Sequence, residues 1–95
     1  YQEGMLFLFD KEDRQSFWMK NTFVPLDIIW INKDKRVVFI KKNAQPCLQD
    51  LCPSISPDRK ARYVLELNSG VSEAIGLRVA DKVTISLFPQ PHKNN

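Results

Sequence analysis

The chain has 95 residues, of which 14 are Lys or Arg and 11 are Asp or Glu, and its formal charge is +3. This length suits one small domain, and a content of 43% hydrophobic and 11% aromatic residues excludes an intrinsically disordered protein. The longest apolar runs, such as Met5 to Phe9, are far shorter than the roughly 20 residues of a membrane-spanning helix.

Apolar runs separated by turn residues predict four strands in the first part of the chain. The first two are expected at Gly4–Phe9 and Ser16–Lys20. The next two have the clearest pattern, Asp27–Ile31 and Arg36–Ile40, and residues 32–35 between them have the composition of a hairpin turn. We therefore expect the third and fourth strands to pair antiparallel.

A long irregular loop is predicted from Lys42 to Lys60, where the periodicity is lost and three prolines and both cysteines occur. Four residues separate Cys47 from Cys52, whereas a catalytic redox pair normally has two residues between its cysteines. A zinc site would need two further ligands, which the single His cannot supply. A structural disulfide, worth about 2 kcal/mol for so short a loop, is favoured over two free thiols and indicates an oxidising compartment.

A fifth strand and a short helix follow this loop. Tyr63–Leu67 has the strand pattern again. We expect Asn68 or Ser69 to cap a helix over Gly70–Ile75, because their side chains can accept hydrogen bonds from the first free N–H groups. Gly76 stands where a helix usually ends.

The last predicted element is an alternating strand over Val83–Phe88, and residues 89–95 are expected to form a flexible tail after a single domain at 1–88. Six strands and one short helix predict an α+β fold that is mostly β. Two neighbouring strands with continuous apolar runs favour burial on both faces. A small curled antiparallel or mixed sheet, or a barrel-like domain, would provide that burial.

Polar residues gather between two apolar strands in the stretch from Phe17 to Asp27. Alternation places Trp18 and Lys20 on one face, and a carboxylate at Asp27 is costly unless it is paired or hydrogen-bonded. One interpretation is structural: Asp27 accepts backbone N–H bonds and pairs with Lys20. The other is a small binding site, with Trp18 as a stacking surface and with polar contacts from Lys20, Asn21, Asp27 and Arg62.

Signatures of catalysis and of cofactor binding are missing from the sequence. The single His, His92, lies in the expected tail, and no glycine-rich phosphate loop or metal-ligand spacing occurs. We therefore expect no cofactor and no metal, and enzymatic activity is disfavoured. The alternative is an enzyme that uses Asp27 and Lys20 as an acid–base pair.

Basic residues cluster in the predicted hairpin between Lys33 and Lys42. Such a cluster can contact nucleic acid, but it also occurs on ordinary solvated surfaces and strand ends. Because no recognised nucleic-acid motif accompanies these residues, the solvated surface is favoured over nucleic-acid binding.

Several motifs are long and unusual: Gly4-Met5-Leu6-Phe7, Phe17-Trp18-Met19-Lys20-Asn21-Thr22, Pro25-Leu26-Asp27-Ile28, Arg62-Tyr63-Val64-Leu65-Glu66, Gly70 and Gly76-Leu77. Together they resemble the bacterial and archaeal family known as domain of unknown function 192. The resemblance implies a compact, mostly β domain with a short helix, often exported behind a signal peptide or lipoprotein anchor. It implies no biochemical activity, because the family is uncharacterised.

The chain departs from the family pattern in two places. Family members usually carry a strand and a short helix before the Gly-Met-Leu-Phe run, so we expect the chain to lack them. An exposed sheet edge near Met5–Phe9 could then be a product of this shortening rather than a binding site, and we expect an oligomer through an exposed strand edge. Lys35 stands where members commonly have Gly in an Asp-Gly turn. Because a positive φ at Lys costs roughly 1 kcal/mol, we expect a turn that avoids this conformation.

These observations favour a small binding or accessory domain in the periplasm or outside the cell, with its site near the Phe-Trp-Met-Lys-Asn-Thr motif. Its partner is an unidentified small ligand or protein.

Overall fold

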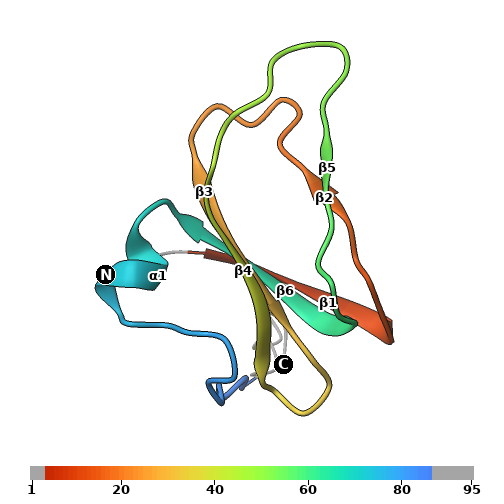
Figure 1. Ribbon diagram of the computed structural model, residues 1–95, viewed down its shortest axis with the longest axis vertical. Helices are drawn as coiled ribbons and strands as arrows, with labels where there is room; N and C mark the ends of the chain where they lie inside the picture. The colour runs from red at the N-terminus through yellow and green to blue at the C-terminus, as the bar shows by residue number, and fades with distance from the viewer. Residues whose placement is uncertain (1–3, 87–95) are drawn as a thin grey trace, which may run out of the picture.

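Strands dominate the computed structural model, which describes residues 4–86 (Figure 1). The larger sheet is antiparallel, with the order β1-β6-β3-β4. Its strands are β1 (Gly4–Asp13), β3 (Leu26–Ile31), β4 (Val37–Ala44) and β6 (Ala61–Asn68). A second antiparallel sheet pairs β2 (Phe17–Trp18) with β5 (Ser54–Ile55), and α1 (Val71–Ala74) is the only helix of the described part.

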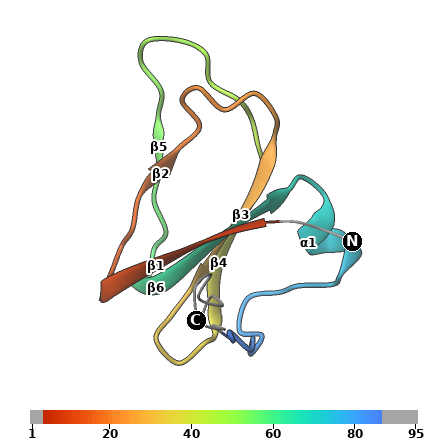
Figure 2. The same cartoon turned by 180° about the vertical axis from the view of Figure 1, so that it is seen from behind.

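The expected fold class is confirmed: the chain is mostly β, with antiparallel sheets and one short helix. The β2–β5 pair stands to one side of β3 and β4, seen from the front and from behind (Figures 1 and 2). Within residues 4–86 the sheets curl but close no barrel, because neither edge strand of the larger sheet, β1 or β4, pairs with β2 or β5. No helix of these residues is long and apolar enough to span a bilayer.

The central strand β3 carries the core. It pairs with β4 on one edge and β6 on the other, and residues Asp27 to Ile31 are all buried. Trp30 packs on one face between the rings of Phe17 and Phe39, at centroid distances of 6.2 and 5.3 Å. Its Nε1 donates a hydrogen bond of 2.6 Å to the carbonyl of Gln15. The prediction that continuous apolar runs indicate burial on both faces is therefore correct for β3.

Several predicted boundaries are wrong. β1 runs on to Asp13, beyond the predicted end at Phe9, and β2 covers only Phe17–Trp18 of the predicted Ser16–Lys20. Residues 83–86 form no strand, since the nearby chain makes only an isolated bridge between Lys82 and Arg36. Leu87, Phe88 and the expected tail 89–95 lie outside the described residues. The predicted irregular loop contains β5 and also the end of β4, because tertiary pairing with β2 and β3 extends these strands.

The turn before β4 does not avoid a positive φ, contrary to expectation, because Lys35 has φ +64°. The side chain of Asn32 accepts hydrogen bonds from the N–H groups of Asp34 and Arg36, at 3.0 and 2.9 Å. The Lys35 ammonium also lies 5.5 Å from the centre of the Tyr63 ring, a favourable cation–π distance. These contacts hold the turn and offset the backbone cost.

The edge strand β1 has a strand partner, β6, on one side only within the described chain. Its large apolar side chains Met5 and Leu8 are exposed. Oligomerisation through this edge stays a prediction.

The end of α1 agrees with the prediction at Gly76, which has φ +70°. The N–H of Gly76 donates to the carbonyl of Glu73 and that of Leu77 to the carbonyl of Ser72, at 3.0 and 2.9 Å. This pair of bonds is a Schellman motif, which satisfies carbonyls that the helix leaves free and needs a left-handed residue.

We expect Gly76→Ala to lower the free energy of unfolding by about 1 kcal/mol. A Cβ at this position would meet no atom within 4 Å, so the cost comes from the left-handed backbone alone. Urea denaturation measures the change. Gly76→Asn is the matched control and should lose less, because Asn tolerates this conformation better than Ala. Equal stability of all three proteins would contradict the assignment.

Candidate functional site

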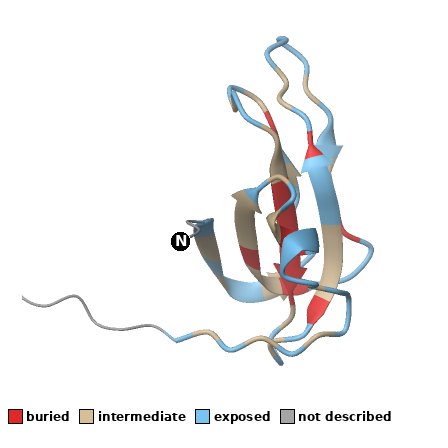
Figure 3. Ribbon diagram, turned by 90° about the vertical axis from the view of Figure 1, so that its left-hand side faces the viewer, coloured by how far each residue is buried: buried red, intermediate tan, exposed pale blue. Residues whose placement is uncertain are grey.

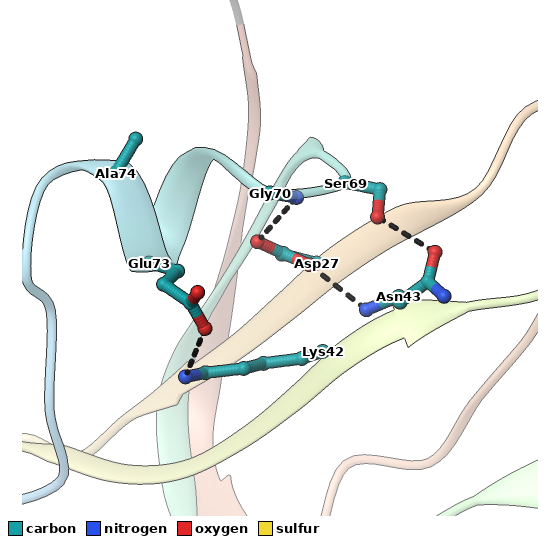
Figure 4. Close-up of a pocket in the computed structure, with 7 residues that line it drawn as sticks. All are labelled: Asp27, Lys42, Asn43, Ser69, Gly70, Glu73 and Ala74. Atoms are coloured by element: carbon teal, nitrogen blue, oxygen red, sulfur yellow. Dashed lines mark hydrogen bonds and ion pairs between the residues drawn. The ribbon is translucent and has the colours of Figure 1, made fainter.

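Asp27 in β3 connects three parts of the chain, and its side chain is 1% exposed. Its Oδ1 accepts a hydrogen bond of 2.9 Å from the N–H of Asn43. Its Oδ2 accepts bonds from the N–H groups of Gly70 and Ser72, at 3.2 and 3.0 Å. The Ser72 hydroxyl donates a further bond of 2.6 Å to the same oxygen. The carboxylate thus ties β3 to β4 and to the start of α1 (Figure 4).

A β-bulge presents Asn43 to this carboxylate. Leu26 pairs with Ala44 and Ile28 with Lys41, so two residues of β4 lie opposite the single residue Asp27. Asn43 has φ +54°, and its side-chain oxygen accepts a hydrogen bond of 2.7 Å from the Ser69 hydroxyl (Figure 4). The bulge therefore frees the Asn43 N–H from the strand ladder for Asp27.

The start of α1 has no cap from its own segment. The residue at the N-cap is Gly70, and no side chain of the preceding residues bonds to the helix start. The prediction that Asn68 or Ser69 caps the helix is therefore wrong. Asp27 takes that role from a strand more than 40 residues earlier, through its bonds to Gly70 and Ser72. A helix cap from another element escapes local sequence rules, which consider only neighbouring residues.

The hydrogen bonds also determine the protonation of Asp27. Burial alone would raise the pKa of this carboxyl group, but the bonds from the Ser72 hydroxyl and from three backbone N–H groups outweigh it and lower the pKa. Asp27 is consequently an anion at neutral pH, and both of its oxygens are occupied by protein donors.

A polar cleft of about 350 Å³ lies beside this network (Figure 4). At its mouth the Lys42 ammonium and the Glu73 carboxylate are 3.5 Å apart, with side chains 51% and 81% exposed. Such an exposed ion pair contributes little to stability. The polar groups deeper in the cleft already bond to one another, so the cleft offers a ligand few free partners.

The structure brings Trp18, Lys20 and Asn21 together but gives Lys20 partners other than Asp27. The Lys20 ammonium lies 5.6 Å from the centre of the Trp18 ring and donates a bond of 2.8 Å to the carbonyl of Asp50. The Asn21 N–H donates to the carbonyl of Cys47 at 3.2 Å. Asp27 accepts backbone N–H bonds, as the structural interpretation expects, but the expected pair with Lys20 is not formed.

The disulfide between Cys47 and Cys52 is present, as predicted. The Cys47 N–H donates a bond of 3.1 Å to the carbonyl of Met19, and Cys47 forms a parallel bridge with Lys20. The disulfide loop and the segment after β2 are therefore joined, and both lie at the same end of the molecule (Figures 1 and 2).

Arg62 lies apart from Asp27. Its Nε donates to the carbonyl of Phe9, near the start of β6, whereas Asp27 pairs with Leu67 near the end of that strand. Five residues of a strand span roughly 17 Å. The five predicted site residues thus occupy three separate places, and a binding role for any of them stays a prediction.

A groove of about 570 Å³ lies next to the disulfide loop, between β4 and β5. Its apolar lining includes Met19, Phe39 and Ile55, while Lys41 is the one charged residue among those that line it. The remaining lining residues are Asn43, Ala44, Gln45, Cys47, Pro53, Ser54 and Ser56. The sequence does not predict this groove, because β5 is a two-residue strand inside a proline-rich loop. Only its pairing with β2 identifies β5 as a strand.

Comparison with known proteins finds one family model and two similar crystal structures. A family model, DUF192, described as "Uncharacterized ACR", matches residues 1–85. No curated protein matches the chain. A crystal structure of a protein of unknown function from Novosphingobium aromaticivorans DSM 12444 is 39% identical, with a TM-score of 0.76 over 84% of this chain and 55% of that one.

A second crystal structure, of a protein from Sinorhizobium meliloti 1021 named a "putative transcription regulator", is 37% identical with a TM-score of 0.75. The match covers 83% of this chain and 59% of that one. The chain therefore spans less than two thirds of the length of either relative.

We expect Asp27→Asn to lower the free energy of unfolding at pH 7 by about 2–4 kcal/mol, because an amide cannot accept all four hydrogen bonds. The lowered pKa means that the carboxylate stabilises the fold fully above its unfolded pKa of about 4, and less as the pH falls through the folded pKa. The difference between the two proteins should therefore be constant from about pH 6 to 8 and shrink below about pH 4. Urea denaturation across this range measures it.

Ser72→Ala is the control for this experiment. It removes one donor and keeps the carboxylate, so it should cost about 1–2 kcal/mol, less than Asp27→Asn. A difference between wild type and Asp27→Asn that does not change down to pH 3 would show that the charge of Asp27 does not stabilise the fold.

Proposed function

This chain belongs to the DUF192 family, and we propose that it is a binding domain, located in the periplasm or outside the cell, whose ligand occupies the groove between β4 and β5. The groove adjoins the Phe-Trp-Met-Lys-Asn-Thr motif, because it is lined by Met19 of the motif and by Cys47, which forms a bridge with Lys20. The disulfide between Cys47 and Cys52 supports the location, because such bonds persist in oxidising compartments.

The observation that carries this proposal is the composition of the groove. Its volume of about 570 Å³ is within the usual range for small-ligand sites, roughly 300–1,000 Å³. Side chains of Met19, Phe39 and Ile55 offer apolar contact, and Lys41 offers a single positive charge. This combination suits a ligand with an apolar body and one anionic group.

The walls of the groove are held before any ligand arrives. The disulfide fixes one side, and the pairing of Phe17 with Ile55 fixes β5. Hydrogen bonds from Cys47 to Met19 and from Asn21 to Cys47 hold the segment between them. A preformed site costs less ordering entropy on binding, which supports a binding role.

An acid–base enzyme receives less support. Both oxygens of Asp27 are engaged by protein donors, and the ammonium of Lys20 bonds to the Asp50 carbonyl. Neither group is free to exchange a proton with a substrate in this arrangement.

Nucleic-acid binding is the second candidate. The relative from Sinorhizobium meliloti is named a "putative transcription regulator", and Lys33, Lys35 and Lys82 line a polar cleft of about 450 Å³ at the hairpin end of this chain. Binding there would weaken steeply with added salt. An electrophoretic shift assay with double-stranded DNA at two salt concentrations distinguishes it from binding in the groove.

The test uses 1-anilinonaphthalene-8-sulfonate, a fluorescent probe with an apolar body and one anionic group. We expect Lys41→Gln to weaken its binding about fivefold, the effect of losing roughly 1 kcal/mol of charge attraction. Lys42→Gln is the matched control: it removes the same charge from the neighbouring residue, which lines the cleft beside Asp27 instead.

Each variant alters an exposed side chain, so all should unfold within about 0.5 kcal/mol of the wild type. Fluorescence titration gives the dissociation constants. Equal affinity of the Lys41 and Lys42 variants would refute the groove as the binding site.

A further inference from the structure

The edge of β4 that faces the groove is only partly covered. Chain segment 80–83 runs along the start of this edge: the Val37 N–H donates to Asp81, and the Ala80 N–H donates to Val37, at 2.9 and 2.7 Å. The Val83 N–H likewise donates to the carbonyl of Lys35, at 2.8 Å. Val37, the first residue of β4, and Lys35 just before it thus already accept a stretch of main chain as a partner.

Beyond Val37 the same edge has no strand partner within residues 4–86, although β4 continues to Ala44. Figure 3 shows this strand along one side of the molecule, with an exposed band near its end. Across the groove, β5 is paired with β2 alone. Two strand edges, one from each sheet, therefore border the same groove, which residues from both strands line.

We propose that the ligand of the groove is an extended peptide segment, which adds as a strand to the edge of β4 and fills the space between β4 and β5. This inference rests on the groove of the proposed function. An edge strand presents a row of N–H and C=O groups, and adding a strand to it is a common mode of peptide recognition. The segment 80–83 already uses this edge in the same way.

The side chains of the groove determine the sequence of the peptide. Phe39 and Lys41 are two residues apart in β4 and both line the groove, so they lie on the same face of the strand. Residues opposite them in an added strand also point into the groove, and they are likewise two apart. The peptide should therefore carry an apolar residue opposite Phe39 and an acidic residue opposite Lys41.

The length of the edge limits the peptide. From Phe39 to Ala44 the strand has six residues, which span about 20 Å at roughly 3.3 Å each. The bulge at Asn43 disturbs the regular pattern near the end of this stretch. Five or six residues of partner strand are thus the most that the edge can pair with.

The experiment measures binding of a fluorescein-labelled peptide, Thr-Glu-Thr-Ile-Thr-Val-Thr, by fluorescence anisotropy. Two further peptides carry N-methyl groups on alternate residues, the first peptide along one edge of the extended chain and the second along the other edge. Each peptide keeps every side chain but loses the N–H donors of one edge. We expect the unmodified peptide to bind, and the peptide methylated on the edge facing β4 to bind at least tenfold more weakly, as the loss of two or three hydrogen bonds implies.

The protein variants provide the control for position. Lys41→Gln should weaken the binding of the acidic peptide but not of a version with Gln in place of Glu, whereas Lys42→Gln should leave both unchanged. Equal binding of all three labelled peptides would overturn strand addition, because the main-chain hydrogen bonds would then contribute nothing.

The outcomes separate this inference from the proposed function. Binding of anilinonaphthalenesulfonate that depends on Lys41, without any binding of the peptide, would overturn strand addition and keep the groove as a small-ligand site. No binding of either probe would overturn both. Sedimentation velocity and anisotropy at rising protein concentration test for a second copy of the chain on this edge. A dimer that excludes the peptide would assign the β4 edge to that second copy instead.

Discussion

The arrangement of this domain depends on one buried carboxylate. Asp27 replaces the missing helix cap of α1, and it accepts the N–H of Asn43 that the β-bulge removes from the β3–β4 ladder. Without a strong acceptor at this point, the N–H groups of the bulge and of the helix start would be buried without partners, which is costly. The direction in which β4 leaves the sheet, toward the disulfide loop, therefore depends on Asp27.

The sequence predicted those elements whose signal is local. The apolar runs of β3 and β4, the end of α1 at Gly76 and the disulfide all depend on neighbouring residues or on short spacing. The cost of a carboxylate at Asp27 could also be recognised. Gly70 and Ser72 could not be recognised as its donors, because they lie more than 40 positions further along the chain than Asp27. Nothing in their own segment indicates a partner outside it.

The groove and β5 escaped prediction for a related reason. Two residues, Ser54 and Ile55, are too short for any periodic pattern, and they form a strand only because Phe17 and Trp18 lie opposite them. Lys35 shows the opposite error: its backbone preference argues against a positive φ, yet the hydrogen bonds of Asn32 and the contact with Tyr63 impose one. For β5 a tertiary pairing creates the strand, whereas at Lys35 local side-chain hydrogen bonds and one tertiary contact together outweigh the backbone preference.

An open strand edge carries a risk, because another copy of the chain can pair with it and aggregate. The second half of β4 bears two features that natural sheets use against this, the charges of Lys41 and Lys42 and the bulge at Asn43. A second copy would bring its own Lys41 near the first, and like charges across paired strands repel each other. An acidic segment would meet attraction at the same position. The side chain that protects the edge from self-association therefore also selects for a partner of opposite charge.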